Sequence, residues 1–152
     1  MTTRANYFAL SAKAMELLLE QENYLSQQFS VSQTVPVSTW ELVKLRVSQI
    51  NQCAFCIDMH STQAQEQGES AERIIGLSAW RDMPMYTETE RVALAWAEHL
   101  TSGQAVDDQD YNEVTAALGE QAVVDLTLAI NAINSWNRVA KTFKPAIGSY
   151  KA

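Results

Sequence analysis

The sequence has few residues that interrupt helices and no long run that favours strands. Its 152 residues include only 5 glycines and 3 prolines, and no extended alternation of β-branched residues predicts a strand. No repeat, low-complexity tract or linker divides it. A chain of this length fits one domain. We therefore expect an all-α fold, a single domain over residues 1–152 built from six or seven helices.

The sequence is also short of positive charge and of long apolar runs. With 11 Lys and Arg against 18 Asp and Glu, the formal net charge is −7. Such a surface repels phosphate backbones and anionic lipids, so we expect neither nucleic acid nor a membrane as partner. No apolar run approaches the roughly 20 residues of a membrane span. The first ten residues lack the layout of a secretory signal, so we expect a cytoplasmic protein.

Apolar spacing and capping residues set the expected helix boundaries. Ser38 is expected to cap the second helix, with Glu41 as its capping-box partner, and Thr87 with Glu90 forms a second such pair. Ser70 is an N-cap, and Gly68, Gly103 and Gly119 are stop signals. The expected helices cover 15–29, 38–50, 53–67, 71–81, 87–102, 107–118 and 121–143.

The only two cysteines lie three residues apart, in Cys53-Ala54-Phe55-Cys56, and His60 follows. On one helix Cys53, Cys56 and His60 fall within an arc of about 60°. Cys53 would lie in the first turn, where free N–H groups favour a thiolate. An imidazole one turn beyond Cys56 can take its proton. Because a lasting structural disulfide is unusual in the cytoplasm, the spacing favours redox chemistry, in which one thiol attacks an oxidant and the other resolves the product.

Glu41 lies twelve residues before Cys53, on the preceding predicted helix. If the two helices fold back on each other, its carboxylate approaches the thiols and can shuttle protons, especially if burial raises its pKa. Two simpler interpretations stay open. Glu41 could serve only in the capping box, or it could be a solvated residue paired with Lys44.

Glu41, Cys53-x-x-Cys56 and His60 together resemble the alkylhydroperoxidase D / carboxymuconolactone decarboxylase family. The stretches TETERVALAWAEHLT and NAINSWNRVAKTF are also similar to this family, and the resemblance covers about residues 15–145. It implies an all-helical fold and a homo-oligomer, a trimer or a hexamer. The peroxidase branch of the family carries the cysteine pair and the decarboxylase branch lacks it, so this chain resembles the peroxidase branch.

The resemblance also implies roles for the residues. Cys56 would attack the peroxide, Cys53 would be the resolving and more exposed thiol, and His60 and Glu41 would complete a proton relay. The substrate would be an organic hydroperoxide or hydrogen peroxide, and the electron donor a dithiol or a lipoylated protein. Helix-dipole reasoning instead favours Cys53 as the more acidic thiol. Members of the branch can also carry a histidine between the cysteines, where this chain has Ala54-Phe55.

Three other functions remain open. The pair could be a non-enzymatic redox sensor, or the chain could be a lyase like the decarboxylase branch. Cys53, Cys56, His60 and either Glu41 or His99 could bind zinc, although one helix presents such ligands poorly for a tetrahedral site. We expect no metal and no cofactor, and a structural or surface role for His99. Asn134, Asn137 and Arg138 are expected to contact another subunit or to cap a neighbouring helix.

Overall fold

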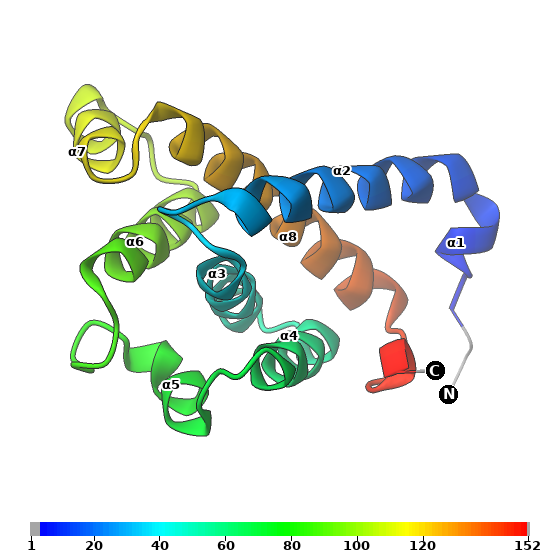
Figure 1. The fold of residues 1–152 in the computed structure, drawn as a ribbon. Coiled ribbons are helices and arrows are strands. Elements are labelled where there is room, and N and C mark those ends of the chain that lie inside the picture. The colour runs from blue at the N-terminus through cyan, green and yellow to red at the C-terminus, as the bar shows by residue number, and fades with distance from the viewer. Residues whose placement is uncertain (1–3, 152) are drawn as a thin grey trace.

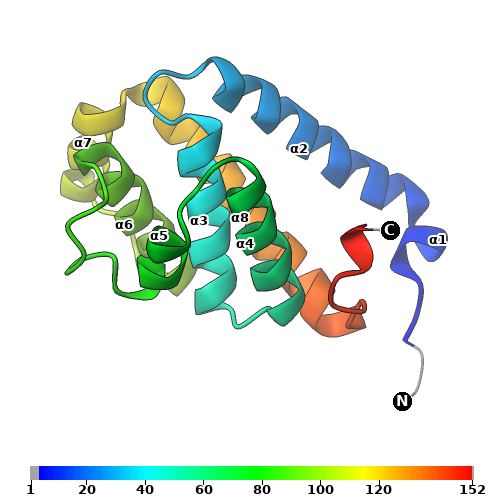
Figure 2. The same ribbon diagram turned by 60° about the horizontal axis from the view of Figure 1, so that its bottom comes forward.

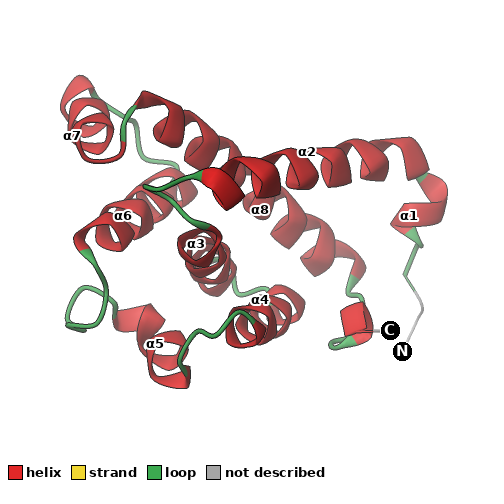
Figure 3. Cartoon of the chain, in the orientation of Figure 1, coloured by secondary structure: helices red, strands yellow, loops and turns green. Residues whose placement is uncertain are grey.

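The computed structural model describes residues 4–151, and within that range the regular elements are all helical (Figures 1 and 3). Eight α-helices occur there, rather than the expected six or seven, because the short α1 precedes the first predicted helix. The elements are α1 (Tyr7–Leu10), α2 (Ala12–Val31), α3 (Val37–Ile50), α4 (Ala54–Glu66), α5 (Ala71–Gly76), a 3₁₀ turn (Leu77–Ala79), α6 (Glu88–Ser102), α7 (Asp108–Leu118), α8 (Glu120–Phe143) and a 3₁₀ turn (Ser149–Lys151).

Helix α3 runs through the middle of the fold and packs against α4, α6 and α8 (Figures 1 and 2). Nearly all its residues from Thr39 to Ser48 are buried, polar ones included. A helix that is buried all round needs apolar or paired side chains on every face. Leu42 and Leu45 supply the apolar contacts, and burying each side chain contributes about 1.5–3 kcal/mol. The charged side chains on α3 must therefore find partners inside the protein.

Several predicted boundaries are confirmed and three are wrong. The Thr87–Glu90 capping box starts α6, and Gly103 ends it in the left-handed conformation. The capping box predicted at Ser38 does not form, because α3 already begins at Val37 after Pro36 and has no side-chain cap. The helix predicted over 71–81 ends as an α-helix at Gly76 and continues as a 3₁₀ turn, and α2 extends beyond 15–29 at both ends. Glu41 is therefore free of any capping role.

Helices α7 and α8 meet at a sharp corner at Gly119. In the described part of the chain, no single helix is both long and apolar enough to cross a membrane. This pair satisfies length and composition only when joined across its 111° bend. Much of the apolar face of α8 instead lies in the main core, with Leu126 and Ile130 fully buried.

The N-terminal segment of the described chain lies beside the end of α8, which the C-terminal turn follows (Figures 1 and 2). The rings of Tyr7 and Phe143 are 5.1 Å apart. The hydroxyl of Tyr150 donates to Asp58, whose Oδ2 is 2.9 Å away, and lies 3.0 Å from the hydroxyl oxygen of Thr62. These contacts tie the N-terminal segment to the end of α8 and the C-terminal turn to α4, where Tyr150 also packs against Phe55.

Candidate active site

The turn between α3 and α4 fixes the position of Cys53. Asn51 is the C-cap of α3, and Gln52 adopts a left-handed conformation with a φ of 54°. The amide of Cys53 then donates to the carbonyl of Ser48 over 3.0 Å. The sequence had predicted Cys53 in the first turn of α4. In the structure Cys53 is instead the N-cap of α4, and Cys56 occupies the first turn. Both sulfurs thus lie where unpaired amides and the helix dipole favour a thiolate, which removes the preference for Cys53 alone.

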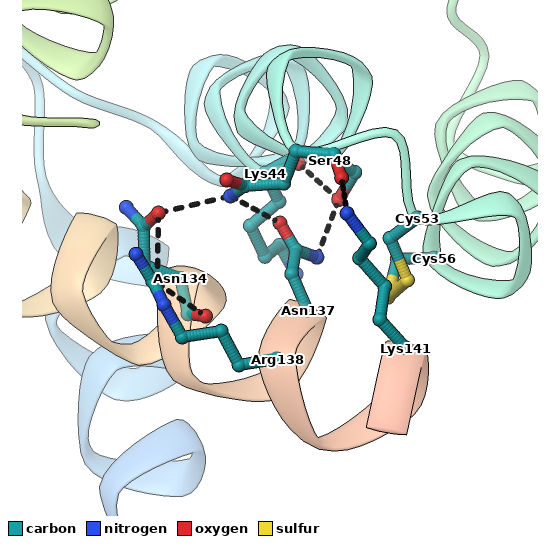
Figure 4. The surroundings of a disulfide bond; sticks show 9 residues. Lys44, Ser48, Cys53, Cys56, Asn134, Asn137, Arg138 and Lys141 are labelled. Carbon is teal, nitrogen blue, oxygen red and sulfur yellow. Dashed lines mark hydrogen bonds between the residues drawn. A yellow bond between two sulfur atoms is a disulfide. The ribbon is translucent and has the colours of Figure 1, made fainter. Parts of the chain in front are cut away.

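Cys53 and Cys56 are joined as a disulfide across a Cα–Cα distance of 5.3 Å (Figure 4). The exposed fraction is 1% for Cys53 and 2% for Cys56. The expectation that Cys53 is the more exposed thiol is therefore wrong, because Ala140 on α8 packs against the pair. The two sulfurs differ in another way, since Cys56 lines a cavity whose wall does not include Cys53.

Side chains of α8 hold the turn before Cys53 in place (Figure 4). The side-chain Nδ2 atom of Asn51 donates to the side-chain oxygens of Asn134 and Asn137, both over 2.9 Å. Asn137 in turn donates to the hydroxyl of Ser48 over 3.0 Å, and Lys141 donates to the carbonyl of Asn51 over 2.6 Å. Asn134 and Asn137 thus cap a neighbouring helix, one of the two roles expected for them. Buried amide groups that are fully paired fix one conformation of the turn.

Arg138 does not join this network toward α3. Its guanidinium donates back to the carbonyl of Asn134, in its own helix, over 2.9 Å. The expected grouping of Arg138 with the two asparagines therefore holds only within α8.

Glu41, Lys44 and His60 form a buried triad beside the cysteines. The Oε1 atom of Glu41 lies 2.6 Å from Nδ1 of His60, and its Oε2 atom lies 2.8 Å from Nζ of Lys44. The exposed fraction of Glu41 is 2% and that of His60 is 4%. The pairing of Glu41 with Lys44 is real, but the interpretation of Glu41 as a solvated residue is wrong. The sequence had placed no functional weight on Lys44.

The ionisation of Glu41 also differs from the expectation. Burial alone acts to raise the pKa of this carboxyl, but the hydrogen bond and charge of His60, together with those of Lys44, outweigh burial and lower the pKa below its usual value. Glu41 therefore stays ionised in the site. A fixed carboxylate orients the imidazole and stabilises its protonated form, which is a supporting role rather than that of a proton donor.

The second nitrogen of the His60 ring is not paired. Nε2 is buried and has no hydrogen-bond partner among residues 4–151. Because His60 follows Cys56 by four residues on α4, the two side chains share one helix face. Both line the same cavity. An imidazole that is held by Glu41 at one nitrogen and free at the other can exchange a proton with the neighbouring sulfur.

The cavity has a volume of about 1120 Å³, and we call it the substrate cavity. Phe55, Met59 and Trp136 make much of its wall apolar, and Lys44, His60 and Glu22 form a polar region. Segments from both chain ends also line it. Large, mostly apolar hollows with a few convergent polar groups are typical of small-molecule sites. The Phe55 ring packs edge-on against Tyr150 at 5.8 Å, and both rings line the wall near Cys56.

Glu22 is a second residue that the sequence did not indicate. It lies on α2, more than thirty residues before Cys56, and no motif contains it. Burial raises the pKa of its carboxyl, while the charges of Lys44 and His60 act in the opposite direction without cancelling the effect. A pattern of helical spacing could have placed Glu22 on the inner side of α2, but it could not have shown what Glu22 faces.

The alternative zinc ligand His99 lies in a different environment. Its Nε2 atom is 2.9 Å from the carbonyl oxygen of Ala105 and 3.8 Å from a carboxylate oxygen of Asp110. Across the described ranges, no three His, Cys, Asp or Glu side chains are grouped so as to hold a metal ion. His99 thus has the structural role that was expected of it.

Known proteins are similar to this chain in sequence and in fold. The chain is 41% identical to the uncharacterised protein YdfG of Bacillus subtilis over 142 residues, which is 92% of this chain and 93% of YdfG. A crystal structure from Agrobacterium tumefaciens, described as a protein of unknown function and provisionally as the antioxidant defence protein AhpD, is 36% identical with a TM-score of 0.84. That match covers 95% of this chain and 97% of the other.

A peroxidase-related protein from Silicibacter, itself uncharacterised, has a TM-score of 0.79 at 19% identity, over 91% of this chain and 72% of its own; this likeness concerns the fold. The profile of the carboxymuconolactone decarboxylase family matches residues 13–99, which include Glu41, both cysteines and His60. The chain therefore belongs to the carboxymuconolactone decarboxylase family of alkylhydroperoxidase D-like helical proteins.

Proposed function

We propose that this protein is a thiol-dependent peroxidase that reduces hydroperoxides through Cys53 and Cys56, assisted by His60 and Glu41. The observation that carries the proposal is the position of the cysteine pair, bonded to each other beside a histidine that is held by a buried carboxylate at one nitrogen and unpaired at the other. The Agrobacterium relative, with its provisional description as an antioxidant protein, supports the same class of chemistry.

Cys56 is the sulfur that meets the peroxide, because it lines the substrate cavity together with His60. His60 takes the proton of the Cys56 thiol, and the thiolate attacks one peroxide oxygen. The S–O bond forms as the O–O bond breaks, and the leaving alkoxide takes the proton from His60. The products of this step are an alcohol and a sulfenic acid on Cys56.

Cys53 then resolves the sulfenic acid. Its sulfur attacks the Cys56 sulfur, the S–S bond forms, and hydroxide leaves as water with the proton of the Cys53 thiol. The pair loses two electrons and the peroxide gains two. The Cα–Cα distance of 5.3 Å lies within the range of ordinary disulfides, so the resolution needs little backbone movement. A dithiol donor, for which the family suggests a lipoylated protein, returns the pair to the thiol form.

The proposal includes assembly of the chain into a homo-oligomer, a trimer or a hexamer, in the cytoplasm. Apolar side chains on α1 and α2 are exposed in the single chain, with Leu10 at 76% and Leu17 at 54%. Exposed apolar residues gathered on one region are typical of a contact surface. A mass of one 17.0 kDa chain by light scattering would contradict the assembly.

Turnover with cumene hydroperoxide and a lipoylated donor tests the activity. The parent chain should consume many equivalents of peroxide, whereas Cys56→Ser should consume none above background and Cys53→Ser at most one equivalent. Ser102→Ala, in a different region of the chain, is the matched control. Equal rates for the parent and Cys56→Ser would refute the proposal.

The same samples separate the other functions. A redox sensor would be oxidised once and then stop with every donor. A lyase of the decarboxylase type would keep its activity after both cysteines are alkylated. A zinc protein would carry about one equivalent of metal by elemental analysis. Each of these results would replace the peroxidase assignment rather than refine it.

A further inference from the structure

Two hollows meet at the triad. Besides the substrate cavity, a smaller hollow of about 360 Å³ lies between α2, α3 and α4, and we call it the polar hollow. Glu41 and Trp40 form part of its wall, and the indole N–H of Trp40 has no partner among the described residues. Buried polar groups in such small spaces are commonly satisfied by water. The polar hollow thus offers water a place behind the triad, opposite the apolar wall of the substrate cavity.

Three side chains line both hollows, namely Glu22, Lys44 and Gln63. Of these, Gln63 does not titrate, and Lys44 is bound to Glu41 over 2.8 Å and lies over the ring of Trp40 at 3.8 Å. Glu22, whose carboxyl has Trp136 as a hydrogen-bond neighbour, is therefore the titratable group of this shared wall that forms no salt bridge within residues 4–151. Its half-buried carboxyl already holds a proton more tightly than an exposed one does, because burial raises its pKa.

We propose that Glu22 is the solvent end of the proton relay, exchanging protons with water in the polar hollow on one side and with His60 on the other. The inference rests on the proposed thiol chemistry and extends it from α4 to α2. It assigns separate routes to the two reactants, because peroxide reaches Cys56 through the substrate cavity and protons reach His60 past Glu22.

The charges around Glu22 permit this exchange. From α3 it faces Glu41 and Lys44, which neutralise each other, and from α4 it faces His60, with Glu66 farther along the polar hollow. Arg4 and Lys144 of the chain ends lie on the wall of the substrate cavity. When a proton passes from Glu22 to His60, the net charge of the buried group does not change. The transfer thus avoids the large cost of adding a lone charge to the interior.

The relay is needed when the disulfide is reduced. The donor's first thiolate attacks the Cys53 sulfur and forms a mixed disulfide with it. The Cys53–Cys56 bond breaks, and Cys56 leaves as a thiolate that takes a proton from His60. The second donor thiolate attacks the mixed disulfide and releases Cys53, which is protonated in turn. The donor releases two protons to water outside and the pair gains two inside. Protons must therefore enter the buried site, and Glu22 replaces the proton that His60 has given.

Single-turnover reduction of the Cys53–Cys56 disulfide by excess dithiothreitol tests the relay without any peroxide. The rate is followed by tryptophan fluorescence and by free-thiol titration from pH 5.5 to 8.5. Glu22→Gln keeps the shape of a protonated carboxyl, so we expect it to fold, with an unchanged circular dichroism spectrum. Glu22→Asp is the conservative variant. Glu66→Gln is the matched control, because it removes a carboxylate that lines the polar hollow but not the substrate cavity.

Glu22→Gln should be reduced about tenfold more slowly than the parent at acidic pH. The two rates should converge as the pH rises, because Glu22 in the parent then loses the proton it would donate. Glu22→Asp should recover at least half of the lost rate, and Glu66→Gln should match the parent. A ratio of parent to Glu22→Gln that stays constant with pH, or no recovery in Glu22→Asp, would overturn the inference.

This experiment separates the inference from the peroxidase assignment. A Glu22-dependent pH profile in a parent that turns over no hydroperoxide would refute the proposed function and leave the relay in place. If the parent turns over peroxide but its disulfide is reduced at the same rate as that of Glu22→Gln, the relay is refuted and the proposed function stands.

Discussion

Two groups of paired charges in this chain differ in one respect. Around the starts of α5 and α6, the guanidinium of Arg73 binds Glu69 over 2.8 Å and Glu90 over 2.6 Å, and it also donates to the carbonyl of Met85. Burial acts to lower the pKa of Arg73, but its two carboxylate partners outweigh burial and raise it. In the Glu41–Lys44–His60 triad, by contrast, one buried nitrogen of the His60 ring has no partner within residues 4–151.

Under the proposed function, this difference separates a cluster that holds the fold from one that takes part in catalysis. We call Arg73, Glu69 and Glu90 the arginine cluster. Each of its charged groups is paired, and Glu90 also completes the capping box of α6. No group of the arginine cluster is therefore left to exchange a proton. An unpaired polar atom in the interior costs about 1–3 kcal/mol. The triad tolerates this cost beside a cavity and a sulfur pair, which is where an exchangeable proton is useful.

Glu41→Gln should produce the largest effect on the triad. The amide cannot stabilise a protonated imidazole, and if its N–H groups donate to His60 they favour the wrong tautomer for accepting the Cys56 proton. We expect peroxide turnover to fall about 100-fold or more, as measured in the coupled assay with a lipoylated donor. Full turnover in Glu41→Gln would show that the triad is structural, like the arginine cluster.

Arg73→Met, in the arginine cluster, should lower stability and leave turnover unchanged. The methionine keeps the apolar stem, but Glu69 and Glu90 lose their common partner. We expect the free energy of unfolding to fall by about 3 kcal/mol, as measured by urea denaturation. Turnover per folded molecule should not change, because no residue of the cluster lines the substrate cavity. Loss of turnover in the folded variant would contradict the separation of the two clusters.

Asn137→Ala tests the network that positions the cysteine turn. The buried amide of Asn137 accepts from Asn51 and donates to Ser48, and its removal leaves both partners short of a bond. We expect a loss of about 2 kcal/mol in unfolding free energy and faster hydrogen exchange at the amide of Cys53. Arg138→Ala, one residue along on the exposed side, should cost about 0.5 kcal/mol or less. Equal losses in the two variants would mean that the turn does not depend on the network.

The sequence contained most of the fold and the motif part of the site. The boundaries at Thr87 and Gly103 were predictable because capping residues act within one turn of the helix they cap. The start of α3 was not, because Pro36 and the burial of Val35 set the entry of the chain before Ser38 could act as a cap. Short α1 lacks a periodic apolar face and gave no signal.

Residues joined through space rather than along the chain were out of reach. Cys53, Cys56 and His60 lie within eight residues, so helical spacing was enough to group them. Glu41 came from the family motif, yet its lowered pKa depends on Lys44 and His60 acting together against burial. Glu22 reaches the site from α2 and the asparagines reach it from α8, and no local rule connects those helices with the cysteines.

Acid titration gives the smallest effect but separates the carboxyls of Glu41 and Glu22 by sign. The pKa of Glu41 is lowered in the fold, so its charge stabilises the protein above the unfolded value of about 4.3 and this contribution is lost as the pH falls through the lower, folded value. In urea denaturation at each pH, the deficit of Glu41→Gln in unfolding free energy should be full at pH 6 and shrink below about pH 4.

The pKa of Glu22 is raised, so its ionisation costs stability once the pH exceeds the unfolded value. Glu22→Gln should therefore be more stable than the parent at pH 7 and equal to it at pH 3. Curves of the same sign for the two variants would contradict the opposite roles of these carboxyls.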